Sequence, residues 1–317
     1  MKISINVLLF FLITICFSQQ SKRNLVSENK SFIINFINTN DTITTQKSLN
    51  LEWLKLDLEN LNNIISIANN KKALENDSFF KKSIINFDLR DTKDLGFGLT
   101  LIDGAQYGGY VTTWVKALTY KNKIIQYEFS YTINDFEIVN YLIKNNTDLK
   151  SKIILKQTDV APYSLNYINE LSYQNFTNKA KKKLGKINLK IDNTNEKLKA
   201  AYNLLTDPIN TYDFGKYCYE GSSQPEGYKA INYLISSNNL NIIKEIIKGY
   251  NPEGRLYAIE AILVAASENK IVLTNEDKAL IKKILKLNIL IKKCDGCKVF
   301  KTYVGEILDS KLKKLIE

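Results

Sequence analysis

The sequence predicts an α+β fold, in which a mixed N-terminal region with an antiparallel β-hairpin sheet precedes a C-terminal α-helical array. Two stretches rich in β-branched and aromatic residues, 110–120 and 124–133, are joined by a short polar turn, which is typical of a β-hairpin. From residue 193 onward, apolar residues recur at helical spacing instead. The expected boundaries are a signal peptide at 1–18, an α+β domain at 19–178, a Lys-rich linker at 179–192 and an α-helical domain at 193–317.

The N-terminus has the pattern of a signal peptide. Lys2 precedes an apolar run from Val7 to Phe17, and Ser18 follows as a small residue near the expected cleavage point. We therefore expect an exported, periplasmic or extracellular protein without a transmembrane anchor after cleavage, because no later segment is apolar enough to span a bilayer. Cys16 provides a lipoprotein alternative, although the residues before it lack the small residue that lipoprotein processing prefers.

Two elements of the N-terminal region can be placed from their periodicity. Residues 51–68 carry one apolar stripe at helical spacing and are expected to form a helix. In the second strand of the hairpin, Ile125 and Tyr127 share one face, whereas Gln126 and Glu128 share the other. We therefore expect one face of this strand to be covered and the other to face water.

The charge pattern of the chain is basic. The sequence has 44 Lys and Arg against 33 Asp and Glu, which gives a formal net charge of +11. The lysines are densest in the expected linker, at Lys179, Lys181, Lys182, Lys183 and Lys186. Such a run predicts either a solvated linker or a site for a polyanion such as an anionic lipid surface or an acidic polysaccharide. Nothing in the pattern predicts recognition of a specific nucleic acid.

The C-terminal half is divided by helix-start signals. Asn193 and Glu196 have the spacing of a capping box. The tripeptide Pro-Glu-Gly occurs at 225–227 and again at 252–254, a spacing within the range of short helical repeats. Further helices are expected at 240–248, at 274–290 and at 303–316, from their apolar periodicity.

The stretch 251–266, NPEGRLYAIEAILVAA, is expected to be the central helix of this half. Asn251 is a preferred N-cap, Pro252 suits the first helical position, and Glu253 places a negative charge at the positive end of the helix dipole. Arginine occurs only at positions 23, 90 and 255, and every other basic side chain in the sequence is a lysine. We therefore expect Arg255 to be a structural helix clamp, whose guanidinium binds backbone carbonyls or a carboxylate at a neighbouring helix end.

The residue types restrict the chemistry that the chain can perform. The sequence contains no histidine, which removes the commonest general base and every histidine-containing nucleophile pair or metal site. A zinc site needs about four ligands, and only three cysteines remain after the expected cleavage. No motif predicts a catalytic residue, a cofactor or a metal, so the sequence favours a non-enzymatic protein.

The Cys294-Asp295-Gly296-Cys297 turn is expected to carry a structural disulfide, since an exported protein folds in an oxidising compartment. We favour a Cys294–Cys297 bridge that braces the turn. The alternative is a bond between one of these cysteines and Cys218, which would leave the other thiol free.

The segment 249–258, GYNPEGRLYA, together with the CDGC turn, resembles a GxxPxGRLYA-type motif of uncharacterised exported bacterial proteins built of HEAT- or armadillo-like helices. The resemblance covers at most residues 200–317. It implies a helical array without a known activity, and a fold alone does not define a function.

Three functions follow as hypotheses. The leading one is an exported, non-enzymatic scaffold or interaction protein that binds an unknown protein or another component of the bacterial envelope. The second is a small-ligand carrier or enzyme with a site between the N-terminal sheet and neighbouring helices, which a polar, carboxylate-lined cleft near Arg90, Glu128 and Asp135 would support. The third is polyanion binding through the basic linker.

Overall fold

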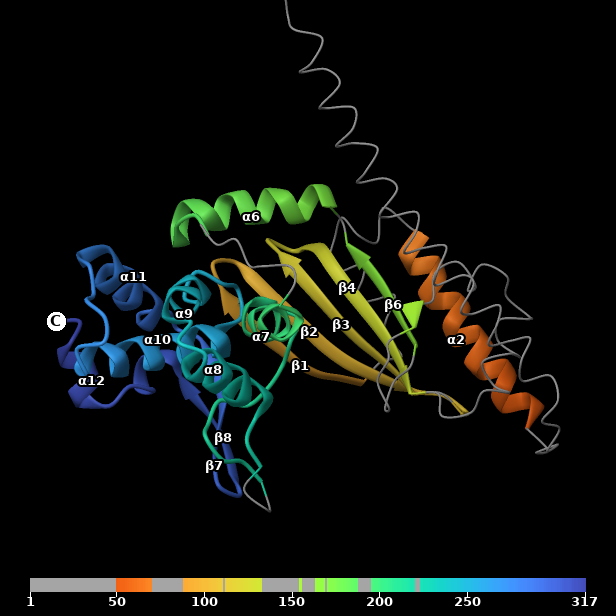
Figure 1. Cartoon of the computed structure of the whole chain (residues 1–317). Helices are drawn as coiled ribbons and strands as arrows, with labels where there is room; N and C mark the ends of the chain where they lie inside the picture. The colour runs from red at the N-terminus through yellow and green to blue at the C-terminus, as the bar shows by residue number, and fades with distance from the viewer. Residues whose placement is uncertain are drawn as a thin grey trace, which may run out of the picture. The chain divides into compact units, whose positions relative to one another are not determined.

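The structure, a computed structural model, describes residues 50–69, 88–110, 112–132, 154–155, 163–168, 170–187, 195–219 and 223–317. The chain divides into two compact units, one formed by residues 1–64, 107–113 and 129–166, the other by residues 65–106, 114–128 and 167–317. Figure 1 labels the helices and strands of both units. The signal peptide predicted at 1–18 lies outside the described residues.

In the first unit, helix α2 (Leu51–Asn69) packs closely against the chain at Gly109. The Asp57 carboxylate accepts hydrogen bonds from the backbone N–H groups of Gly109 and Tyr110, both at 2.8 Å. A Cβ atom at Gly109 would lie 2.7 Å from the Cα of Trp53, so this contact requires glycine. The predicted helix at 51–68 is therefore confirmed.

The N-terminal sheet contains the predicted hairpin. Its strands are β1 (Asp88–Gly96), β2 (Leu99–Tyr107), β3 (Thr112–Tyr120), β4 (Lys123–Thr132), β5 (Ile154–Leu155) and β6 (Tyr163–Ile168), in the order β1-β2-β3-β4-β6-β5. Lys121 and Asn122 join β3 to β4 with φ angles of 49° and 62°, which is the left-handed conformation that two-residue hairpin turns require. Ile124 to Tyr127 are all buried, so the expectation that one face of β4 is wet is wrong at this end.

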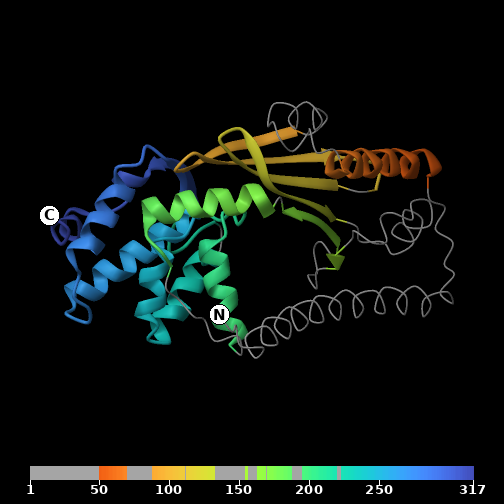
Figure 2. The same cartoon turned by 90° about the horizontal axis from the view of Figure 1, so that it is seen from above.

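In the second unit, helix α6 (Glu170–Leu184) covers part of the sheet. Its Phe176 and Ala180 pack against Leu95, Leu99, Leu101, Leu118 and Ile125 of strands β1 to β4, and Figure 2 shows this helix in green beside the helices that follow it. The predicted linker at 179–192 is therefore helical up to Leu184. The physical reason is that Phe176, Ala180 and Leu184 recur every fourth residue, so the lysines between them lie on the exposed side of one helix.

The helices of the C-terminal half gather around the expected central helix. They are α7 (Glu196–Thr206), α8 (Glu226–Ser236), α9 (Leu240–Ile246), α10 (Pro252–Ser267), α11 (Asn275–Leu285), α12 (Ser310–Lys314) and the short 3-10 helix η2 (Val304–Glu306). Helix α10 contacts α7, α8, α9 and α12, and almost all of its first turns are buried. The N-cap of α7 is Asn195, two residues later than expected.

The repeated Pro-Glu-Gly sequence has a packing role. Gly254 lies against the end of α7, where an added Cβ would clash with the backbone carbonyl of Leu205. Gly227 lies against two aromatic rings, and a Cβ there would come within 2.8 Å of Tyr257 and closer still to Tyr212. Both glycines therefore permit close approach at the start of a helix. The HEAT- or armadillo-like character of this half stays a prediction.

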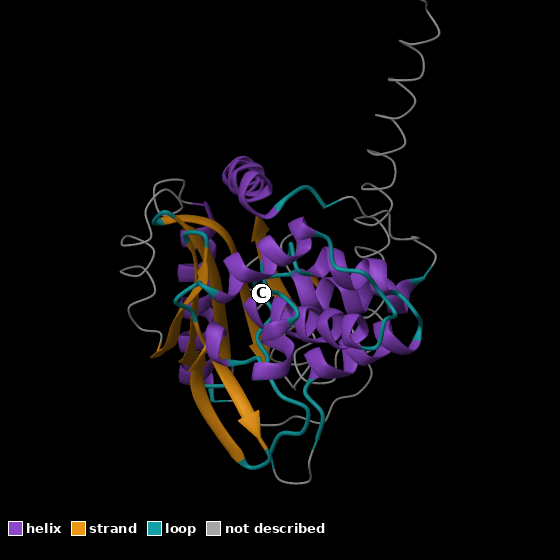
Figure 3. Ribbon diagram, turned by 90° about the vertical axis from the view of Figure 1, so that its left-hand side faces the viewer, coloured by secondary structure: helices purple, strands orange, loops and turns teal. Residues whose placement is uncertain are grey.

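The last part of the chain departs from the predicted helices. Helix α11 ends at Leu285, and residues 290–303 form a hairpin of β7 (Leu290–Asp295) and β8 (Lys298–Tyr303), drawn among the orange strands of Figure 3. The helix expected at 303–316 is reduced to η2 and α12. Backbone hydrogen bonds explain the strand: Phe214 donates to the Lys292 carbonyl at 2.8 Å, and Cys294 donates to the Phe214 carbonyl at 2.9 Å. Pairing with a distant segment thus stabilises a strand in the residues between the two predicted helices.

Candidate ligand-binding cavity

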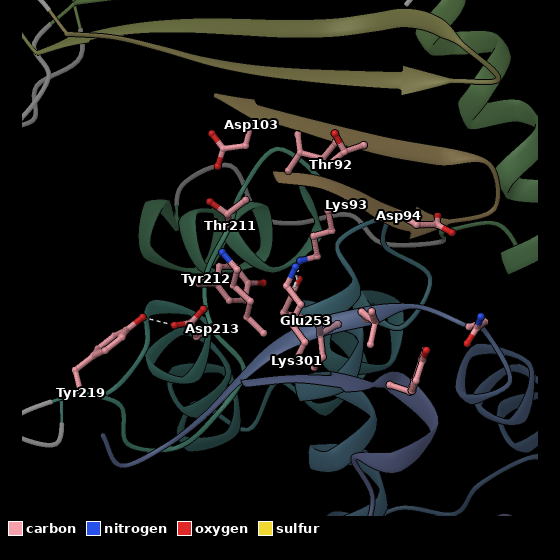
Figure 4. A pocket seen from close by; sticks show the side chains of 16 residues that line it. Thr92, Lys93, Asp94, Asp103, Thr211, Tyr212, Asp213, Tyr219, Glu253 and Lys301 are labelled. Carbon is pink, nitrogen blue, oxygen red and sulfur yellow. Dashed lines mark hydrogen bonds and ion pairs between the residues drawn. The ribbon is translucent and has the colours of Figure 1, made fainter. Parts of the chain in front are cut away.

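The second unit encloses a polar cavity of about 440 Å³, shown in Figure 4. Four parts of the chain form its walls: strands β1 and β2, the segment 211–219, the first turn of α10, and the β7–β8 hairpin with the residue Asn288 before it. Seven charged side chains line it, namely Lys93, Asp94, Asp103, Asp213, Glu253, Lys292 and Lys301. A volume in this range suits a small molecule.

A buried ion pair joins two of these walls. The Lys93 ammonium on β1 contacts the Glu253 Oε1 atom at the start of α10, as Figure 4 shows. The Glu253 side chain is 1% exposed and the Lys93 side chain 17% exposed. Within the described residues, the Glu253 Oε2 atom is buried without a hydrogen-bond partner. A buried carboxylate therefore carries an unused acceptor at the edge of the cavity.

Asn251 fixes the start of α10 and so the position of Glu253. Its Oδ1 atom accepts a hydrogen bond from the Gly254 N–H at 2.9 Å, which is the predicted N-cap. Its Nδ2 atom donates to the carbonyls of Asn210 at 2.8 Å and Asp207 at 3.2 Å. The fully buried Asn251 therefore also holds the loop that leads into the segment 211–219.

Arg255 ties the same helix to strand β1. Its Nη2 atom donates to the carbonyls of Leu95 at 2.7 Å and Tyr250 at 3.1 Å. The predicted bonds to backbone carbonyls are present, but they lead to β1 and to the loop before α10, not to another helix end. Burial lowers the pKa of Arg255 to about 10, although Glu253 and Asp94 oppose this shift. Arg255 thus remains charged at neutral pH and is a structural clamp beside the cavity.

The segment 211–219 is held in place from two sides. The Tyr257 hydroxyl accepts a hydrogen bond from the Gly215 N–H at 2.8 Å and lies within bonding distance of the Gly215 and Asp213 carbonyls. On the other side, Cys218 forms a disulfide with Cys294 of β7, with a Cα–Cα distance of 5.4 Å. These contacts position Asp213 and Tyr219 at the cavity.

The Cys218–Cys294 bond corrects the favoured Cys294–Cys297 pairing and agrees with the alternative that involves Cys218. In the hairpin, Cys294 lies opposite Val299 and Asp295 opposite Lys298, so Cys297 falls in the turn at the tip. The buried Cys294 side chain instead faces the segment 211–219. Among the cysteines in the described ranges, Cys297 is free and exposed.

Two tyrosines of the cavity, Tyr212 and Tyr219, are neutral hydrogen-bonding groups. The Tyr219 hydroxyl donates to Asp213, and this hydrogen bond raises the pKa of Tyr219 to about 12. Burial, followed by the nearby Glu253 charge, raises the pKa of Tyr212 well above its ordinary value. At neutral pH neither phenol is charged. The Tyr219 hydroxyl donates to Asp213 and the Tyr212 hydroxyl donates to the Leu204 carbonyl at 3.4 Å, so each phenol oxygen is left as an acceptor.

The basic residues predicted as a polyanion site do not line the cavity. Lys179, Lys181, Lys182, Lys183 and Lys186 are all exposed, the first four on α6 and the last just after it. Two lysines from other segments reach the same region. The ammonium of Lys283 on α11 donates to the Lys183 carbonyl at 2.6 Å, and that of Lys248, in the turn after α9, donates to the Lys186 carbonyl at 3.3 Å. The lysine-rich surface therefore extends from α6 toward α11.

The cleft proposed near Arg90, Glu128 and Asp135 is not tested. The Arg90 side chain and the whole of Asp135 lie outside the described residues. Glu128 is described and does not line the cavity. Sequence reasoning did not identify Lys93, Asp213, Lys292 or Lys301 as cavity residues, and no motif distinguishes these positions from the many other lysines and carboxylates.

Comparison of the chain with protein-family models, with curated proteins and with solved structures finds no match. The described part of the chain contains no cluster of three or more Cys, Asp or Glu side chains suited to a metal ion. In that same part, no helix combines the length and apolar character needed to cross a bilayer.

Proposed function

We propose that the chain is a non-enzymatic binding protein that holds a small polar ligand in the cavity between β1, α10 and the β7–β8 hairpin. The observation that carries this proposal is the buried Glu253 carboxylate, whose Oε2 atom lacks a partner within the described residues. An unsatisfied buried acceptor costs about 1–3 kcal/mol, and more when it is charged. A ligand that donates to this oxygen would remove that cost.

A purely structural role does not account well for the Lys93–Glu253 pair. Arg255 already connects α10 to β1 through the Leu95 carbonyl, two residues from Lys93. A buried ion pair is often no more stabilising than apolar residues of similar size, because both charges must be desolvated. The Lys93–Glu253 ion pair is therefore a second connection between α10 and β1, and ligand binding in the adjoining cavity explains it better than stability does.

The chemistry of the walls supports binding rather than catalysis. The raised pKa values of Tyr212 and Tyr219 leave these groups neutral near pH 7, where a general acid or base works best with a pKa close to that pH. The cavity wall contains neutral phenols, the side-chain amide of Asn288 and the Lys93–Glu253 ion pair. Such groups recognise polar ligands by hydrogen bonding. The same arrangement does not activate a nucleophile.

The proposal is tested by titrating the full chain with small polar solutes under calorimetric detection. We expect at least one class of polar solute to bind the wild type and to bind at least ten-fold more weakly to Glu253→Gln. The matched control is Glu260→Gln, which removes a carboxylate from the Lys216–Glu260 pair. This pair lies outside the cavity, its nitrogen and oxygen are 3.7 Å apart, and its side chains are 61% and 30% exposed. Equal affinities of wild type and Glu253→Gln would contradict the proposal.

Export to an oxidising compartment is part of the same proposal. The Cys218–Cys294 disulfide supports it, since structural disulfides persist outside the cytosol. Fractionation of cells that produce the full chain, with thiol labelling of each fraction, tests it. A protein that stays in the cytosol with reduced cysteines would contradict export.

A second candidate function is polyanion binding by the lysine-rich surface of α6. Its support is the arrangement of five exposed lysines with Lys283 and Lys248 beside them. Binding to anionic vesicles or heparin should then fall steeply with salt. Binding that is absent or insensitive to salt would exclude this candidate. The helical scaffold predicted from the sequence also stays a proposal, with a protein or envelope partner still to be identified.

A further inference from the structure

The charged groups of the cavity already have partners. The Lys93 ammonium contacts the Glu253 carboxylate. The Asp213 carboxylate accepts the Tyr219 hydroxyl, as the dashed line in Figure 4 shows. Each of the other charged residues of the wall also has an interaction partner, namely Asp94, Asp103, Lys292 and Lys301. A charged ligand would therefore have to compete with these existing contacts for a counter-charge.

The positive and negative charges around the cavity also balance in number. Three lysines and four carboxylates line it. The guanidinium of Arg255 is buried beside the cavity, and its charge interacts with those of Glu253 and Asp94. With Arg255 the count is four positive against four negative groups. Because a charge that leaves water without gaining a partner is unfavourable, the cavity favours a ligand without ionised groups.

The polar atoms that remain for a ligand include hydrogen-bond acceptors on two walls. Within the described residues, the Oε2 atom of Glu253 at the start of α10 is buried and has no hydrogen-bond partner. The Tyr219 hydroxyl, in the segment 211–219, donates its hydrogen to Asp213, so its oxygen can accept one from a ligand. The ligand therefore needs uncharged donors at more than one position. Several hydroxyl groups on one ring meet this need.

Two phenol rings give the same cavity an apolar surface. Tyr219 is 51% exposed and Tyr303 is 42% exposed, although both line the cavity. Leu290 lies directly opposite Tyr303 in the hairpin and lines the cavity as well. A phenol combines an apolar ring with a polar tip, so it can pack on the C–H face of a sugar ring while hydroxyl groups bond at its edge.

We infer that the ligand of the cavity is a neutral saccharide, a mono- or disaccharide without an ionised group. The inference rests on the proposed function and names the ligand class of the same site. One sugar hydroxyl donates to the Glu253 Oε2 atom, and such a bond to a charged acceptor is stronger than one between neutral groups. A second hydroxyl donates to the Tyr219 oxygen, and one face of the ring packs on Tyr303. Sugar hydroxyls also accept hydrogen bonds, which suits the Asn288 amide in the wall.

The test is a calorimetric titration of the full chain with three matched series, based on glucose, galactose and mannose. Each series compares the neutral hexose and a neutral disaccharide that contains it with the 2-amino sugar, a cation, and the uronate, an anion. We expect at least one neutral sugar to bind with an affinity that does not change with salt concentration, and its charged counterparts to bind at least ten-fold more weakly.

Two variants locate the binding and one serves as the control. Glu253→Gln and Tyr303→Ala should each weaken binding of the neutral sugar at least ten-fold. The control is Phe300→Ala, which removes a ring of the same strand that is 44% exposed and lies outside the cavity, and it should leave the affinity unchanged. Circular dichroism reports whether each variant is folded. Equal losses in Tyr303→Ala and Phe300→Ala would overturn the assigned ring contact.

The two levels of the inference fail in different ways. An amino sugar, a uronate or alanyl-alanine that binds more tightly than every neutral sugar, and that depends on Glu253, would overturn the saccharide and leave the proposed binding function intact. Acetamide that binds where no sugar does would have the same meaning. If none of these compounds binds and a wider panel of polar solutes also fails, the proposed function itself is wrong.

Discussion

Removal of the Lys93 ammonium should destabilise the protein more than removal of the Glu253 charge. In Lys93→Met, a carboxylate that is 1% exposed keeps its charge and loses its partner. Breaking a buried pair in this way costs about 3–5 kcal/mol. In Glu253→Gln, the ammonium left behind is 17% exposed and can recover contacts with water in the cavity, so we expect a loss of about 1–2 kcal/mol.

The double variant completes a thermodynamic cycle. With neither charge present, the loss should be smaller than the sum of the two single losses, by about 2 kcal/mol. Urea unfolding followed by circular dichroism measures all four proteins, and Lys216→Met of the exposed pair should change the free energy of unfolding by less than about 0.5 kcal/mol. A loss below about 1 kcal/mol in Lys93→Met, or a larger loss in Glu253→Gln, would refute this account of the pair.

Three further predictions concern the framework around the cavity. Asn251→Ala should lower the free energy of unfolding by about 3 kcal/mol, because it removes an N-cap and the side-chain amide that donates to two backbone carbonyls. Asn251→Ser keeps the cap and should lose about 2 kcal/mol. Equal losses in urea melts would show that the cap contributes nothing to stability. Cys218→Ser should lower the free energy of unfolding by about 2–4 kcal/mol, because the disulfide it removes spans 76 residues. Cys297→Ser should leave the urea midpoint unchanged, since this cysteine is free. The reverse pattern would exclude the Cys218–Cys294 bond. Burial raises the pKa values of Tyr173 and Tyr202 to about 12, so the folded state favours neutral phenols. The stability that results is complete below about pH 10, where tyrosines of the unfolded chain begin to ionise, and should be lost as the pH rises toward 12. A urea midpoint that stays constant over that pH window would contradict this prediction.

The elements predicted correctly are those whose signals lie close together in the sequence. The Asn-Pro-Glu-Gly start of α10 contains its own N-cap, first residue and close-packing glycine within four positions. The β3–β4 hairpin likewise combines two β-rich stretches with a two-residue turn. Arg255 was identified because arginine is rare in a lysine-rich chain, which is a compositional signal that needs no structure.

The features that the sequence did not predict depend on distant partners. Residues 290–295 contain a lysine pair between apolar residues and fit a helical pattern as well as a strand; their pairing with Phe214 and with β8 selects the strand. The same pairing brings Cys294 to Cys218 and leaves Cys297 at the hairpin tip. Lys93 and Glu253 are 160 positions apart, so no local spacing indicates that they meet.

The lysine-rich stretch of α6 illustrates how a charge pattern can hide a helix. Five lysines within eight positions suggested a linker, because a dense run of like charges repels itself. Phe176, Ala180 and Leu184 nevertheless provide a narrow buried stripe, and the lysines in the last turn favour the negative end of the helix dipole. The packing of these three residues therefore determines that the segment is a helix, and the lysines determine only which face of the helix is exposed.

The most direct test of the binding cavity is a titration of small polar solutes into the wild-type protein and into Glu253→Gln. The account predicts a saturable heat of binding of at least one solute to the wild type and at least ten-fold weaker binding to the variant, with both proteins folded by circular dichroism. Binding of equal affinity to both proteins would show that the Glu253 carboxylate does not hold the solute, and would contradict the central claim.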